Sequence, residues 1–248
     1  MSWSHGPSAT AQARLMGLDA LRGIAILMMV AFHFCFDLTY WRLAHFQLLS
    51  DWRWIVWRDL IVSLFLLLVG MSLVLARGQS AARFWRRWAR LTGCALLISL
   101  VSWGMFHQRF IYFGVLHFIS LTWLLSRLWL SRAAWLRHRV LLPLALLCLL
   151  AGGLLAFPAM DPRWLNWLGL AAHKPATEDY VPLLPWLGVV LLGMSLAQTP
   201  LAAWLGRRGG GGWRPLAWLG RHSLAIYLLH QPLLMGLLAL YVWYRASA

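Results

Sequence analysis

Long apolar stretches separated by short polar segments dominate the sequence. A helix needs about 20 apolar residues to cross the hydrocarbon core of a bilayer, and several stretches reach that length. They cover roughly residues 18–40, 54–76, 90–107, 111–130, 139–157, 182–199 and 219–243. Such runs are too long for barrel strands, and hydrocarbon tolerates only closed hydrogen-bond ladders. The pattern predicts an all-α, polytopic membrane bundle of about seven transmembrane helices.

Two boundaries complete this organisation. The third and fourth stretches are joined by residues 106–110, which must form a tight turn; one continuous helix there would reduce the count to six. Residues 1–17 carry one Arg and no cleavage-type pattern, so they are predicted to form a short cytoplasmic tail. Residues 18–248 show no repeat and no second domain, and are predicted to form a single transmembrane domain.

Composition and charge support the membrane assignment. Of the 248 residues, 61% are hydrophobic and 12% are charged, against about 25% charged in a typical soluble domain. The net charge of +15 would suit nucleic acid, but the basic residues occupy short gaps between apolar stretches. Such gaps mark the cytoplasmic side of a membrane protein, so the bilayer is the predicted partner and nucleic acid is not.

The distribution of basic residues predicts the orientation. Alternate gaps, beginning with the segment before the first stretch, hold 15 of the 22 basic residues, and the opposite side holds seven together with most of the acids. By the positive-inside rule, the N-terminus faces the cytoplasm and the C-terminus the periplasm.

The first apolar stretch carries a stripe of ionisable residues. Asp19, Arg22, His33 and Asp37 fall on one face at 100° per residue. Inserting each such residue at the centre of a membrane helix costs roughly 2.5–3.5 kcal/mol, so its presence indicates a structural or functional role. Asp19 and Arg22, at i,i+3, could be a structural ion pair. The i,i+4 spacing of His33 and Asp37 favours a general base with an orienting carboxylate.

Other stretches carry matching polar residues. Asp59 and His117 lie, like His33, toward the predicted outer leaflet, whereas His230 lies nearer mid-membrane on the same face as Ser223 and Tyr227. The segment 220–223 (Gly-Arg-His-Ser) at the start of the last stretch suggests an anion site, with Arg214 nearby. The alternative is a topology anchor with Ser223 as the helix N-cap. The three cysteines show no paired spacing, and no metal site is predicted.

Several segments resemble one family of membrane enzymes. These are LDALRGIAILMMV at 18–30, Asp59-Leu60 with Phe65 and VGMS at 69–72, FGVLH at 113–117, LPWLG at 184–188, WLGRHSL at 218–224 and IYLLH at 226–230. Together they resemble the heparan-alpha-glucosaminide N-acetyltransferase catalytic-domain family, in a compact bacterial form. The resemblance implies a multi-pass enzyme of the bacterial inner membrane. It would transfer an acyl group, expected to be acetyl, from cytoplasmic acetyl-CoA to an amino sugar or another small envelope acceptor. A homo-oligomer is possible.

The resemblance and the polar stripe together suggest roles. The catalytic candidates are His33 as base, Asp37 or Asp59 as its orienting carboxylate, and His117 either as a residue that supports these groups or as an oxyanion partner. The donor-binding candidates are Arg22 along the pantetheine route, Arg214, Arg221 and His222 at the phosphates, and Ser223, Tyr227 and His230.

A second histidine competes with His33. In eukaryotic members an essential His follows the first helix, shortly before a Trp and an Asp-Leu pair. Matching Trp52 and Asp59 to that pattern places Leu49 at this position, and His45 lies four residues earlier. Those members have Asn where this chain has His33. The base is expected at His33, with His45 as the alternative.

Two other function classes fit the same polar residues. A proton-coupled transporter or flippase would use the stripe as a proton relay. A b-type haem protein would use His33 and His117 as axial ligands from facing helices.

Overall fold

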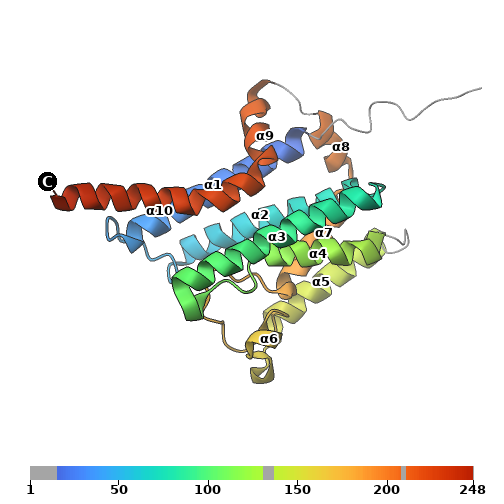
Figure 1. The fold of residues 1–248 in the computed structure, drawn as a ribbon. Helices are drawn as coiled ribbons and strands as arrows, with labels where there is room; N and C mark the ends of the chain where they lie inside the picture. The colour runs from blue at the N-terminus through green and yellow to red at the C-terminus, as the bar shows by residue number, and fades with distance from the viewer. Residues whose placement is uncertain (1–15, 131–136, 208–210, 248) are drawn as a thin grey trace, which may run out of the picture. The chain divides into compact units, whose positions relative to one another are not determined.

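The computed structural model describes residues 16–130, 137–207 and 211–247, and the regular secondary structure in these ranges is helical (Figure 1). Two isolated β-bridges, Phe113 to Tyr180 and Phe157 to Ala171, join connecting segments. The predicted all-α class is confirmed.

In the described ranges, seven longer helices overlap the predicted apolar stretches in order, and three short helices lie between stretches or at the start of the last one. They are α1 (Met16–Tyr40), α2 (Trp52–Leu75), α3 (Ala81–Phe106), α4 (Val115–Leu130), α5 (His138–Leu154), α6 (Arg163–Asn166), α7 (Leu183–Leu196), α8 (Pro200–Arg207), α9 (Arg214–Arg221) and α10 (Ser223–Ser247). Short 3-10 turns are η2 (His107–Arg109), η4 (Pro158–Met160) and η5 (Gly211–Trp213).

Four helices in the described ranges are long and apolar enough to cross a membrane. They are α1, α2, α10 and the segment Ala81–Arg109, which joins α3 to η2. The apolar helices Val115–Arg127, His138–Leu154 and Leu183–Leu196 are shorter than about 18 residues. The seven spans and the orientation of the termini therefore stay predictions.

Three helix boundaries refine the sequence expectation. α3 begins at Ala81, nine residues earlier than predicted, because its first turns are rich in Arg and fall outside the apolar stretch. The tight turn after Phe106 is confirmed: His107 has a positive φ of 46° and ends the helix. The last stretch, predicted to be one helix over 219–243, is divided at His222, where α9 ends and α10 starts one residue later.

The chain divides into two compact units. The terminal unit comprises Met1–Phe65 and Pro200–Ala248, and the central unit comprises Leu66–Thr199. α2 runs from the first unit into the second.

Close backbone contacts hold the terminal unit together. A Cβ on Gly23 of α1 would lie 2.0 Å from the carbonyl oxygen of Leu216 in α9, and a Cβ on Gly220 would lie 1.7 Å from that of Asp19. Glycine at both positions lets the two helices touch backbone to backbone. α10 lies along α1 (Figure 1). The apolar core beside them is built from Ile26, Met29, Phe32, Leu48 and Ile61.

The central unit is built from two helix pairs. α5 packs on α7, and α3 packs on α4, where the hydroxyls of Thr92 and Ser120 form a hydrogen bond of 2.7 Å. Glycine again permits close approach, since a Cβ on Gly193 of α7 would lie 2.1 Å from the carbonyl oxygen of Leu67 in α2. Satisfied hydroxyls and small residues are typical of helix contacts inside membranes.

Candidate active site on the first and last long helices

Two histidines meet in the terminal unit. His33 of α1 and His230 of α10 lie with ring centroids 4.8 Å apart and ring planes at 76°, an edge-to-face contact. His230 is buried, with 9% of the residue exposed. The contact brings together a predicted catalytic residue and one predicted to lie on the donor side, which makes them one candidate site.

Backbone carbonyls fix the tautomer of both rings. Nδ1 of His33 lies 2.9 Å from the carbonyl oxygen of Met29, and Nδ1 of His230 lies 2.8 Å from that of Tyr227. A carbonyl oxygen only accepts, so each neutral imidazole carries its proton on Nδ1. Nε2 of each ring is then the basic nitrogen, as a general base requires.

A second contact between the same helices joins Asp37 to Gln231. The side-chain amide of Gln231 donates to Oδ1 of Asp37 at 2.6 Å, and the Asp37 side chain is fully buried. Asp37 shares a helix face with His33 as expected, but its hydrogen bond goes to Gln231, while Nδ1 of His33 bonds backbone. The structure therefore places an amide, and not a histidine, against the carboxylate.

Gln231 was absent from the sequence candidates. Its signal was its position directly after His230 and before Pro232, inside an otherwise apolar helix. A neutral amide carries no insertion penalty comparable to that of a charge, so the cost of placing a residue in the membrane does not single out Gln231.

Arg22 takes part in an ion pair at the crossing of α1 and α9. Its guanidinium lies 2.6 Å from Oδ1 of Asp19, three residues earlier. The neighbouring Gly23 is a point of backbone contact with α9. This geometry fits the structural interpretation of the Asp19–Arg22 pair, and it also holds one cation beside α9.

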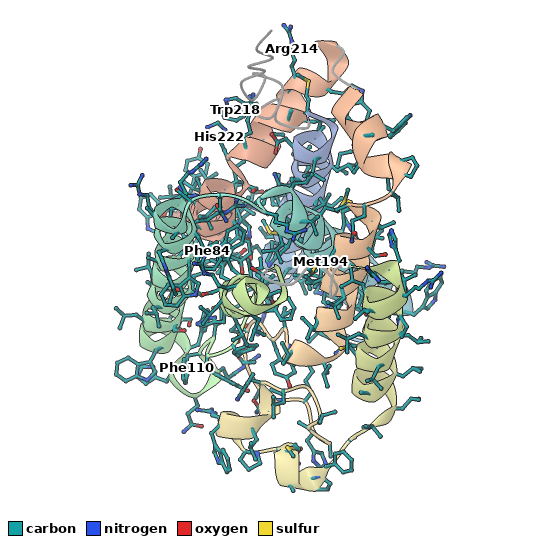
Figure 2. All side chains as sticks on the ribbon, turned by 90° about the vertical axis from the view of Figure 1, so that its right-hand side faces the viewer. Phe84, Phe110, Met194, Arg214, Trp218 and His222 are labelled. Carbon is teal, nitrogen blue, oxygen red and sulfur yellow. The ribbon has the colours of Figure 1, made fainter. Side chains whose placement is uncertain are left out.

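The polar face of α9 is open to the surroundings. Arg214, Trp218 and His222 are exposed and follow one another at intervals of four residues, along one side of the helix (Figure 2). The Trp218 and His222 rings lie 4.5 Å apart, and Nδ1 of His222 donates to the carbonyl of Trp218 at 2.8 Å. Arg221 is exposed as well. These residues offer two guanidinium groups and an aromatic face.

The N-terminus of α10 differs from the predicted anion site. Because α9 runs almost directly into α10, the backbone N–H of His222 is already bonded to the carbonyls of Trp218 and Leu219. Ser223 begins α10, and Tyr227, one turn on, lies with its ring 5.9 Å from that of His230. Any anion binding here would rest on the arginine side chains.

Three other candidates make contacts of their own. Asp59 is partly exposed and paired with the adjacent Arg58 at 2.9 Å. His45 is exposed in the segment between α1 and α2. His117 belongs to the central unit, where Nδ1 accepts from the N–H of Gly114 at 3.3 Å and Nε2 lies 2.9 Å from the Ser99 hydroxyl. Both ring nitrogens of His117 are thus engaged.

One comparison with known proteins identifies the chain. The sequence model of a family described as heparan-alpha-glucosaminide N-acetyltransferase, catalytic, matches residues 14–232. No curated protein sequence and no solved structure matches the chain significantly. The match includes α1, the His33–His230 contact and the Asp37–Gln231 contact, and it covers most of the chain. The chain therefore belongs to the heparan-alpha-glucosaminide N-acetyltransferase catalytic family of membrane acetyltransferases.

Proposed function

We propose that this protein transfers an acetyl group from cytoplasmic acetyl-CoA to the amine of an amino sugar or a related envelope acceptor. The enzyme would act in the bacterial inner membrane, with its N-terminus in the cytoplasm and its C-terminus in the periplasm. Family membership supports the reaction class. The arrangement of basic gaps supports the orientation.

The observation that carries the proposal is the contact between His33 and His230. Two imidazoles with centroids 4.8 Å apart both present Nε2 as the basic nitrogen, inside two helices that are long and apolar enough to cross a membrane. Ionisable residues in such segments are expensive and are usually functional. Proton transfer at an attacking nitrogen is the chemistry that fits them.

In the proposed reaction His33 is the general base. The amine nitrogen attacks the thioester carbonyl carbon and the carbon–sulfur bond then breaks. Nε2 of His33 takes a proton from the attacking nitrogen and returns it to the departing CoA sulfur. The Nδ1 bond to Met29 holds the ring in the tautomer that this step needs.

The donor would be held from the cytoplasmic side by α9. Arg214 and Arg221 supply guanidinium groups for the CoA phosphates, and Trp218 with His222 supplies an aromatic surface. Arg22 lies next to the α1–α9 crossing and would line the route of the pantetheine arm toward His33.

The hydrogen bonds of His117 argue against the haem alternative. A haem ligand needs one free ring nitrogen, whereas the structure engages Nδ1 of His117 with Gly114 and Nε2 with Ser99. A proton relay for transport would use the same histidine pair and is separated from the transferase by the assay below.

The test is acetyl transfer by purified protein. With acetyl-CoA and glucosamine, we expect release of free CoA thiol and formation of N-acetylglucosamine by mass spectrometry. N-acetylglucosamine is the matched control acceptor, because its amine is already acylated, and it should give only background thiol. Folded protein that binds acetyl-CoA but acetylates no member of an amine panel would refute the proposal.

A further inference from the structure

In the described part of the terminal unit, four buried polar atoms have no hydrogen-bond partner. Three are acceptors: Oδ2 of Asp37, Oε1 of Gln231 and Nε2 of His230. One is a donor, Nε1 of Trp41, which lies one helical turn beyond Asp37. Native proteins pair nearly all such atoms, so a group of three orphaned acceptors calls for a specific reason.

The three acceptors belong to one small region. Gln231 is bonded to Asp37 at 2.6 Å and is adjacent to His230 in sequence, and His230 touches His33 of the helix that carries Asp37. Asp37 is fully buried, and its side-chain hydrogen bond in the described part of the chain comes from a neutral amide. A buried carboxylate normally has a cationic partner, and the ion pairs found in the described ranges do not include Asp37.

We propose that Asp37, Gln231 and His230 form the subsite that binds the protonated amine of the acceptor. The proposal rests on the proposed acetyltransferase function and adds the residues that recognise its second substrate. An ammonium group carries one positive charge and, in a primary amine, three N–H donors. It matches three acceptors of which one belongs to a carboxylate. Trp41 adds a donor suited to a hydroxyl or ring oxygen of a sugar.

The subsite also completes the proton balance. An amine that arrives as ammonium must lose one proton before it can attack, and it loses a second as the amide forms. Nε2 of His230 takes the first proton and releases it to solvent once the amide product has left the subsite. Nε2 of His33 takes the second and delivers it to the CoA sulfur. Two basic imidazoles in contact supply one acceptor for each proton.

The competing explanation is a structural lock between α1 and α10 whose orphaned atoms are met by water. A lock would affect stability and both substrates alike. A subsite for ammonium would affect the amine acceptor and leave the CoA donor unchanged. The two are therefore separated by comparing KM for glucosamine with KM for acetyl-CoA.

The test uses Asp37→Asn, which keeps the shape of the side chain and removes its charge. We expect KM for glucosamine to rise about tenfold or more, because a charge-assisted hydrogen bond is lost, while KM for acetyl-CoA stays unchanged. Gln231→Met should shift the same constant in the same direction by a smaller factor. The matched control is Asp51→Asn in the segment before α2, where Asp51 accepts from the backbone of Arg53 and no effect on either KM is expected.

A binding measurement tests the ammonium subsite independently of catalytic turnover. Wild-type protein should bind glucosamine in preference to glucose by calorimetry, and Asp37→Asn should abolish that preference. Wild-type protein that shows this preference but releases no CoA would overturn the proposed function and keep the subsite. Turnover with an unchanged glucosamine KM in folded Asp37→Asn would overturn the subsite alone. If Asp37→Asn does not fold, an unchanged glucosamine KM in Gln231→Met overturns it.

Discussion

Replacing Gly220 by alanine tests the closest approach between α1 and α9. The added Cβ would lie 1.7 Å from the carbonyl oxygen of Asp19 and 3.0 Å from the backbone nitrogen of Gly23. Ordinary van der Waals contact begins at 3.4 Å. Both obstructing atoms are backbone, so no side-chain rotation relieves the clash, and the two helices must separate.

The cost follows from the size of that clash. Overpacking by one methyl group costs about 1–3 kcal/mol, and alanine in a helix returns up to about 1 kcal/mol relative to glycine. For a chain of this length each 1 kcal/mol corresponds to about 2–4 °C, so we expect a melting temperature lower by several degrees. Because α9 carries Arg214 and Arg221, the affinity for CoA should fall in the same variant.

The assay is thermal unfolding in detergent together with calorimetric titration of CoA. Gly236→Ala in α10 is the matched control, because a Cβ there meets nothing within 4 Å. It should melt at or slightly above the wild-type temperature and bind CoA normally. If Gly220→Ala behaved like Gly236→Ala in both measurements, the backbone contact between α1 and α9 would be refuted.

Three further predictions address the donor site, the topology and an ion pair. Arg221→Ala should weaken CoA binding about tenfold or more in calorimetry, and unchanged affinity would make Arg221 only a topology anchor. A reporter fused after Ala248 should be periplasmic and one inserted at 209–212 cytoplasmic; the opposite result would refute the orientation. Hydrogen bonds from His173 hold the pKa of the partly exposed Asp161 carboxyl below its ordinary value of 3.8. A carboxyl with a lowered pKa stabilises the fold above its ordinary pKa and loses that contribution as the pH falls. The difference in melting temperature between wild type and His173→Ala should therefore be present at about pH 5 and shrink as the pH drops below about 4. A difference that grows as the pH drops would refute this prediction.

The sequence pattern predicts the longer helices, because a helix that crosses a membrane needs a length and a hydropathy that can be read from the residues directly. It was less accurate where the structure does not depend on hydropathy. The Arg-rich first turns of α3 are helical although they are too polar to read as a span. The division at His222 depends on local backbone conformation, with φ −100° and ψ 12°, which the pattern of apolar residues does not specify.

In the candidate site, too, the sequence predicts one part of the arrangement and not the other. Helical spacing placed His33 and Asp37 on one face, but spacing does not decide which partner each side chain takes. His33 bonds the backbone of Met29, and Asp37 bonds an amide 194 residues away in sequence. Contacts between distant helices, such as that of His33 with His230, depend on packing that a single sequence does not encode in any short pattern.

The catalytic base is expected at His33 and not at His45, because the two side chains differ in how they are held. His33 is held by Met29 against His230, whereas His45 is exposed in a connecting segment. A base acts best where its geometry is fixed.

The most direct measurement is the rate of CoA release with saturating glucosamine, for the purified and folded variants His33→Ala and His45→Ala. We expect a loss of roughly 10²-fold or more in His33→Ala and near-normal turnover in His45→Ala. An inactive His45→Ala protein beside a His33→Ala protein with near-normal turnover would contradict this expectation.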